Sequence, residues 1–193
     1  DDALIARHLI EAALTRQVEP SKTAPVVWGL DVARFGDDST SLAKRRGNAI
    51  MEPIKMWRGK DLMETCGLIK VEWDATPGSM RPQEILVDVI GLGAGVVDRL
   101  RELNLPVRGI NVAELPALEG HRFHRLRDEL WWKAREWFEA RDCTMPKDEG
   151  LVDELCGPVY NVTSAGKIQV EPKAQMKRRL GRSPDKADAF CLT

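Results

Sequence analysis

Val26-Val27-Trp28-Gly29-Leu30-Asp31-Val32-Ala33 is an apolar run that carries a single carboxylate, and its residue types are typical of a β-strand. A second strand-like run, Ile85-Leu86-Val87-Asp88-Val89, has the same character. Two more aspartates occur in Ser183-Pro184-Asp185-Lys186-Ala187-Asp188, which has the features of a helix start. A carboxylate enclosed by apolar residues needs a cation or hydrogen bonds. These three places therefore form the candidate functional site.

The segments between these places predict a mixed sheet. Residues 26–33, 39–44 and 48–57 are predicted to form an antiparallel meander. Residues 84–89, 96–103 and 107–112 predict a strand, a helix and a strand joined as a right-handed parallel crossover. Further helices are expected at 2–17, 61–71, 122–140 and 148–155, with a hairpin at 158–171 and a last helix capped by Ser183. This order predicts an α/β fold, a ribonuclease H-like mixed β-sheet flanked by helices on both faces.

The composition excludes several classes of protein. The 193 residues and the 43% hydrophobic content suit one domain with a real core. With 29 basic and 30 acidic residues, the net charge of -1 gives no global attraction to nucleic acid, so any DNA contact must use a local patch. The four cysteines lack metal-binding spacing, and no apolar run reaches the roughly 18 residues that span a bilayer.

The aspartates have the chemistry of a two-metal site. Mg²⁺ and Mn²⁺ prefer hard oxygen ligands, and two such ions about 3.5–4 Å apart can clamp both oxygens of a displacement at phosphorus. Asp185 and Asp188 are three residues apart and share one helix face. Asp31, Asp88, Asp185 and Asp188 are therefore the candidate metal ligands. An alternative is open for Asp185, which can also serve the helix dipole.

A basic cluster leads into the third acidic place. A solvated helix face is the usual explanation of such a cluster, but its position beside the acids favours contact with DNA phosphates, which is independent of base sequence and weakens with salt. The candidate DNA-binding residues are Arg34, Lys173, Lys177, Arg178, Arg179 and Arg182. The turn residues Asp37 and Asp38 are marginal candidates for the metal site.

Three motifs carry a resemblance to a known family. Residues 29–40, 87–98 and 183–190 resemble, in this order, the three nuclease motifs of the large terminase subunits of tailed bacteriophages. The resemblance extends from about residue 26 to the end. It implies a metal-dependent endonuclease that cuts double-stranded concatemeric viral DNA during genome packaging, in the cytoplasm of the infected bacterial host. It also implies an acidic triad of Asp31, Asp88 and Asp185, with Asp188 as a further acid and Mg²⁺ or Mn²⁺ as cofactor, with two ions expected.

The resemblance also implies a domain organisation and partners. Residues 1–25 are interpreted as a helix and linker that follow a packaging ATPase domain, and residues 26–193 as the nuclease domain. The chain has no P-loop motif, so the motor belongs outside these residues. Portal and small terminase subunit are the implied partners besides double-stranded DNA, and no membrane contact is expected. The alternatives are a RuvC-type junction resolvase, an actin- or sugar-kinase-like ATPase and a non-catalytic DNA-docking module.

Overall fold

A mixed sheet forms the centre of the molecule. The computed structural model describes residues 3–33, 38–148 and 150–193. The strand order is β3-β2-β1-β5-β6, and β4 also pairs with β2. β1, β5 and β6 are parallel, whereas β2 runs antiparallel to β1, β3 and β4. The strands are β1 (Val26–Asp31), β2 (Thr40–Arg46), β3 (Ala49–Ile50), β4 (Lys55–Trp57), β5 (Glu84–Asp88) and β6 (Val107–Ile110).

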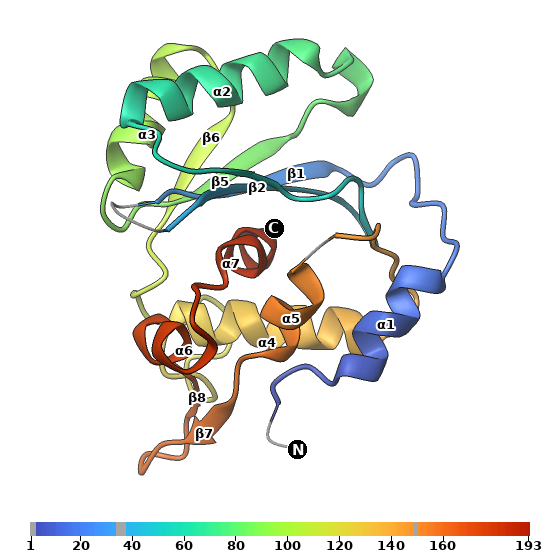
Figure 1. Cartoon of the computed structure of the whole chain (residues 1–193), viewed down its shortest axis with the longest axis vertical. Coiled ribbons are helices and arrows are strands. Elements are labelled where there is room, and N and C mark those ends of the chain that lie inside the picture. Colours follow the sequence, from blue (N-terminus) through green and yellow to red (C-terminus); the bar gives the residue numbers. More distant parts are fainter. Residues whose placement is uncertain (1–2, 34–37, 149) are drawn as a thin grey trace.

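Helices cover both faces of this sheet (Figure 1). α2 (Leu62–Ala75) and α3 (Gly93–Glu102) lie on one face, and α7 (Asp185–Leu192) lies on the other. Beyond α7 lies a layer of helices: α1 (Arg7–Thr15), α4 (Leu126–Glu139), α5 (Leu151–Cys156) and α6 (Lys173–Leu180). The hairpin of β7 (Tyr160–Val162) and β8 (Ile168–Val170) lies on the same side of the sheet. A 3-10 turn at Gly78–Met80 joins α2 to β5. The predicted ribonuclease H-like fold class is confirmed.

The alternation of side chains along β1 and β5 decides which face the acids occupy. Trp28 and Leu30 are fully buried in the cluster that packs under α2 and α3, as are Ile85 and Val87. Because successive residues of a strand point to opposite faces, Asp31 and Asp88 must point toward α7. The parallel register pairs Leu30 with Val87, which sets the two aspartates side by side at the carboxyl ends of their strands.

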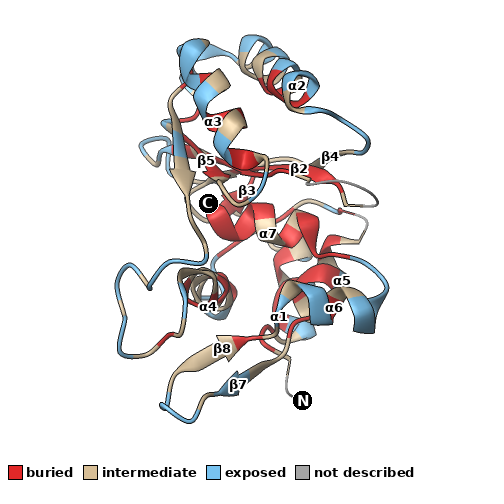
Figure 2. Ribbon diagram, turned by 90° about the vertical axis from the view of Figure 1, so that its left-hand side faces the viewer, coloured by how far each residue is buried: buried red, intermediate tan, exposed pale blue. Residues whose placement is uncertain are grey.

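Gly29 lets α7 lie against the sheet. A Cβ atom at Gly29 would overlap the carbonyl oxygen of Ala189 in the middle of α7. Figure 2 shows α7 as a buried helix between the sheet and the outer helices. Gly93 has a comparable function, because a Cβ there would overlap the carbonyl oxygen of Asp88. A tight strand-to-helix turn therefore leads from β5 to α3.

α1 belongs to the same core as the helices around α7. Leu9, Ile10 and Ala13 of α1 are buried in the hydrophobic cluster that contains Trp131, Leu155 and Phe190. The interpretation of residues 1–25 as a connection from a preceding domain remains a prediction. In the described part of the chain, no helix is both long and apolar enough to cross a membrane.

Several element boundaries differ from the predictions. α1 starts at Arg7 because residues 3–5 are held beside residues 158–159, where the Leu4 N–H donates to the Pro158 carbonyl (2.8 Å). The predicted strand at 48–57 is divided into β3 and β4. α6 was not predicted, since its single buried side chain, Met176, gives no apolar period.

Replacing Gly29 by alanine is expected to push α7 away from the sheet. The overlap with Ala189 lowers the free energy of unfolding by about 1–3 kcal/mol, the usual cost of overpacking. Gly67→Ala is the matched control, because Gly67 lies exposed within α2 with no atom within 4 Å of the added Cβ. The control gains about 0.5–1 kcal/mol. Denaturant titrations of both variants measure the two changes, and equal stabilities would contradict the packing argument.

Candidate metal centre

Three of the four predicted carboxylates meet around one ammonium group. The Nζ atom of Lys173 lies 3.0 Å from Oδ2 of Asp31, 3.1 Å from Oδ1 of Asp185 and 3.1 Å from Oδ2 of Asp188. Asp31 comes from the end of β1, whereas Asp185 and Asp188 come from the first turn of α7. The structure thus brings together acids that are more than 150 residues apart in the chain.

Asp88 lies in the same cavities. Two neighbouring cavities of about 280 and 320 Å³ are both lined by Asp31, Asp88 and Lys173. Asp188 lines the first and Asp185 the second. The Oδ1 atom of Asp88 accepts a hydrogen bond from the Ile90 N–H (3.0 Å), which fixes the carboxylate at the point where β5 ends.

Neighbouring groups orient the helix acids. Oδ2 of Asp185 accepts a hydrogen bond from the Ser39 N–H (3.0 Å), and Oδ1 of Asp188 accepts one from Nε1 of Trp131 (3.1 Å). Oδ1 of Asp185 is buried and lies within ion-pair distance of Lys173, but no hydrogen bond to it is formed by the described residues. This buried carboxylate oxygen at the cavity wall is therefore held by the charge of Lys173 and not by a hydrogen bond from the described part of the chain.

The cluster is short of positive charge. Asp31 and Asp185 are only 7% and 6% exposed. Burial raises the pKa of Asp31 to about 7, the ammonium of Lys173 opposes this rise, and the charge of Asp188 adds to it. Burial disfavours the charged form of Lys173, yet the three surrounding carboxylates raise its pKa above the usual range. When all three carboxyl groups are ionised, they and the one ammonium leave an unbalanced charge of about -2, before Asp88 is counted.

The donor set fits divalent cations. Hard oxygen ligands from rigid elements, one of them without a hydrogen-bond partner, are what Mg²⁺ or Mn²⁺ requires. Within the described residues, no three acidic, histidine or cysteine side chains are arranged as a ready-made metal cluster. The ammonium group of Lys173 lies between the carboxylates and takes the place of a cation. The same oxygens that contact this ammonium can contact a metal ion that displaces it.

The predicted DNA-binding residues do not form one patch. Lys173 faces the acids, and Nζ of Lys177 donates to Oδ1 of Asp38 (2.6 Å). Arg178 is exposed, and Arg179 is bound to Glu171. Arg182 donates to the Gly150 carbonyl (3.2 Å). The predictions for Arg34 and Asp37 lie outside the described residues.

Asp38 is closer to the site than its turn-like sequence indicates. It lines the 320 Å³ cavity with Asp31 and Asp185. Partial burial opposes ionisation, but hydrogen bonds from Lys177 and Ser183 lower the pKa of Asp38. Ser183 therefore does not cap α7 as predicted: its Oγ donates to Asp38 (3.0 Å), and Pro184 is the N-cap residue without a side-chain hydrogen bond.

A carboxyl group that sequence reasoning missed takes over part of the capping. Oε2 of Glu154, in α5, accepts a hydrogen bond from the Ala187 N–H in the first turn of α7 (3.0 Å). Asp148 accepts one hydrogen bond from Lys186 in the first turn of α7 and another from the Ile54 N–H between β3 and β4 (2.6 Å). These contacts fix the turn that carries Asp185 and Asp188. No local motif reveals them, because both partners lie more than 30 residues away from the acids' helix in sequence.

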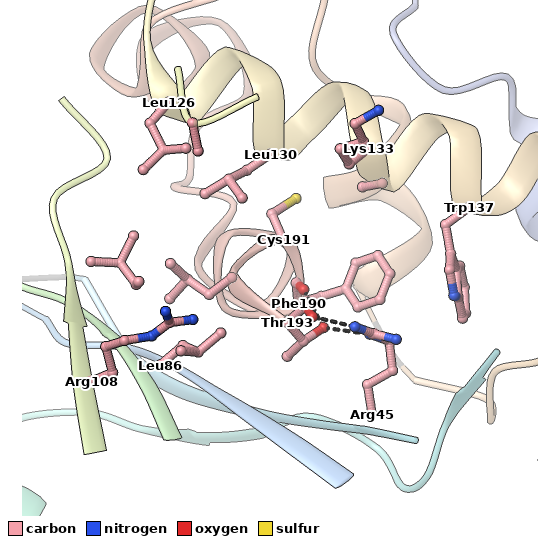
Figure 3. Close-up of a pocket in the computed structure, with 14 residues that line it drawn as sticks. Arg45, Leu86, Arg108, Leu126, Leu130, Lys133, Trp137, Phe190, Cys191 and Thr193 are labelled. Carbon is pink, nitrogen blue, oxygen red and sulfur yellow. Dashed lines mark hydrogen bonds between the residues drawn. The ribbon is translucent and has the colours of Figure 1, made fainter. Parts of the chain in front are cut away.

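A further cavity of about 430 Å³ lies between the sheet, α4 and α7. Figure 3 shows Arg45, Arg108 and Lys133 on its walls among apolar side chains. The Arg45 guanidinium reaches the end of α7, with Nε donating to Oγ1 of Thr193 (3.0 Å). Among the described residues that line this cavity none is acidic, so the candidate chemistry lies in the cavities around Asp31.

Comparisons with known proteins show what the fold is similar to. No family model and no curated protein matches this sequence. The nuclease domain of the large terminase subunit gp2 of bacterial virus Sf6 superposes with a TM-score of 0.77 at 22% identity, over 99% of this chain and 98% of that chain. A variant of that domain with manganese and beta-thujaplicinol gives 0.78 at 21% identity, over 99% and 98%.

A more distant structure has the same architecture. The large terminase nuclease from thermophilic phage G20c, with bound magnesium, superposes with a TM-score of 0.67 at 12% identity, over 99% of this chain and 95% of that chain. The likeness is one of fold at these identities. The chain has the fold of phage terminase nuclease domains along its whole length, as its three motifs predict.

Replacing Lys173 by methionine is expected to make stability depend more strongly on divalent metal. Without metal, the unpaired carboxylates repel one another and the free energy of unfolding falls by about 1–3 kcal/mol, a range reduced because the Lys173 side chain is 36% exposed. Added Mn²⁺ replaces the missing cation, so it raises the melting temperature of Lys173→Met more than that of the wild type. Lys60→Met, at a surface pair with Glu64, is the control. Equal metal-induced shifts in all three proteins would refute the assignment.

Glu154 is expected to make stability depend on pH. Burial, assisted by the charge of Asp185, raises the pKa of Glu154 from 4.5 to about 7, against the Ala187 hydrogen bond. The folded state thus binds more protons than the unfolded state between these values, and stability falls as the pH rises from about 4.5 to 7. Glu154→Gln removes this loss, worth up to about 3 kcal/mol. Melting temperatures at pH 5 and pH 8 measure it, with the exposed Glu114→Gln as control. A wild-type pH dependence in Glu154→Gln would contradict the assignment.

Proposed function

We propose that this chain is the nuclease domain of a tailed-bacteriophage large terminase subunit. It would act as a metal-dependent endonuclease that hydrolyses phosphodiester bonds of double-stranded concatemeric DNA during genome packaging. The observation that carries the proposal is the convergence of Asp31, Asp185 and Asp188 on the ammonium group of Lys173, with Asp88 lining the same cavities. If these aspartates had separate structural roles, they would have no reason to lie together on one face of the sheet.

Metal binding follows from the charge of the cluster. Asp31, Asp88 and Asp185 would form the acidic triad, and Asp188 would be the fourth ligand. Two ions of Mg²⁺ or Mn²⁺, when bound, supply positive charge against the charge that develops on the phosphate and on the leaving oxygen. The related nuclease structures with manganese and magnesium support a divalent ion.

The protein's own groups prepare the site. The Ser39 N–H and the Trp131 indole hold the two helix carboxylates in fixed orientations. Lys173 compensates part of the negative charge, which keeps the carboxylates close together before a metal ion arrives. Pre-oriented ligands lower the cost of organising the site during the reaction.

The cellular setting is part of the same proposal. The chain would act in the cytoplasm of the infected bacterium, connected through residues 1–25 to a packaging ATPase domain of the same polypeptide. Portal and small terminase subunit would be its partners in packaging. Contact of Lys177 and Arg178 with DNA phosphates would hold the duplex without reading its sequence.

Asp31→Asn and Asp88→Asn are each expected to abolish metal-dependent nicking of supercoiled plasmid. Both changes keep the side-chain shape but remove a ligand charge, so the nicking rate falls by at least about 100-fold. Asp98→Asn is the matched control, because Asp98 lies on α3 with a 79% exposed side chain. Circular dichroism checks that the variants are folded. A triad variant that nicks at the rate of the control would remove that residue from the site.

Nicking, compared with activity on other substrates, separates the alternatives. A junction resolvase would cut four-way DNA in preference to a linear duplex. A kinase-like protein would hydrolyse ATP without nicking plasmid. A DNA-docking module would bind duplex DNA and leave it intact with Mg²⁺ or Mn²⁺ present.

A further inference from the structure

Another cavity lies at the carboxyl end of α6. Its volume is about 820 Å³, and its walls come from α1, α5, the last turn of α6 and the turn between α6 and α7. Figure 1 shows α5 between α1 and α6. Arg7, Arg179 and Arg182 all line it, so one cavity brings three guanidinium groups together from distant parts of the chain.

Each arginine of this cavity is paired with a carboxylate. Arg7 donates to Oδ1 of Asp153 (2.6 Å), and Arg182 lies 3.9 Å from the other oxygen of the same carboxylate. Arg179 donates to the Gly157 carbonyl (2.6 Å) and pairs with Glu171. The side chains of Arg7 and Arg182 are 53% and 50% exposed, which leaves their remaining N–H groups accessible from the cavity.

The acids that pair with Arg7 are exposed, and one of them is Glu11, which lies 3.8 Å from Arg7 with a 56% exposed side chain. Asp153 is the carboxylate shared by Arg7 and Arg182, and it is itself 63% exposed. Glu154 also lines the cavity, but it is buried and its carboxyl group accepts from the backbone of α7. The cavity therefore offers planar, partly exposed guanidinium groups, which bind phosphate oxygens in bidentate fashion.

The cavity continues the path that leads to the acids. Ser183 lines both this cavity and the 320 Å³ cavity that contains Asp31 and Asp185. A phosphate chain that passes the acids and crosses the α6–α7 turn would enter the arginine cavity next. A nucleic-acid backbone carries one phosphate per nucleotide. Cationic side chains beside a phosphodiester-cleaving site can therefore bind the phosphates next to the one that is cleaved.

We propose that the cavity of Arg7, Arg179 and Arg182 is a second phosphate-binding subsite, which holds the backbone of the DNA beside the segment at the acids. This inference rests on the proposed function. Asp153 occupies Arg7 and Arg182 when no DNA is bound, and the phosphate takes its place. Arg7 thereby belongs to the DNA-binding surface, although its segment is remote from the nuclease motifs in sequence.

The test is the salt dependence of duplex binding in EDTA, measured by fluorescence anisotropy. Arg7→Gln with Arg182→Gln is expected to lower the slope of log affinity against log salt by about 2, because each phosphate contact contributes about 0.9. Binding at low salt weakens about ten-fold. Arg7→Lys with Arg182→Lys restores most of the slope, since lysine keeps the charge. Asp153→Asn tightens binding because it removes the competing carboxylate.

The control for this test is an exposed arginine on the opposite face of the sheet. Arg101→Gln on α3, where Arg101 is 59% exposed on the other side of the sheet, keeps the wild-type slope. A wild-type slope in the Arg7→Gln, Arg182→Gln protein overturns the subsite, as does weaker binding by Asp153→Asn. Inorganic phosphate that stabilises the wild type, with unchanged DNA binding in the glutamine variant, would mark a free-phosphate site and also overturn it. EDTA prevents cleavage, so the binding slopes do not depend on nuclease activity. A wild-type protein that does not nick plasmid with Mg²⁺ or Mn²⁺ would refute the proposed function, whereas the slopes test the subsite alone.

Discussion

The contact between α7 and β1 is the constraint on which the site depends. A helix backbone reaches a strand backbone this closely only where the strand has no side chain, and Gly29 provides that gap beneath Ala189. Two residues further along β1, the same face presents Asp31, and one turn before Ala189 the helix presents Asp185. The close packing therefore determines the spacing of the carboxylates, so that a packing feature in the core becomes a chemical feature of the site.

Close packing of carboxylates is unfavourable unless something offsets their repulsion. Apolar burial of Trp28, Leu30 and Val87 on the opposite face anchors the strands, and the hydrogen bonds from Ser39 and Trp131 fix the helix acids. Lys173 then supplies one positive charge. The protein therefore keeps more carboxylates than cations in a partly buried cluster. Such an arrangement costs stability and is typical of functional sites.

Local patterns were sufficient for the acids and insufficient for their surroundings. Strand alternation places Asp31 and Asp88 on one face, and helical spacing pairs Asp185 with Asp188, so these could be predicted from sequence. Trp131 fits a helical apolar stripe, and nothing local shows that its indole N–H binds Asp188. Glu154 acts on α7 from a helix 33 residues earlier. The same holds for Lys173, which sequence reasoning grouped with the exposed basic residues because only the fold turns it toward the acids.

α6 divides what the sequence presents as one basic cluster. Lys173 and Lys177 face the carboxylates of Asp31 and Asp38, whereas Arg179 faces the cavity beyond the helix. The backbone atoms that carry these side chains belong to one eight-residue helix. A divalent cation that enters the acid cluster therefore competes with Lys173 for the same oxygens. Ser183 lies on the boundary between the two cavities, so the acids and the arginines occupy neighbouring parts of one surface.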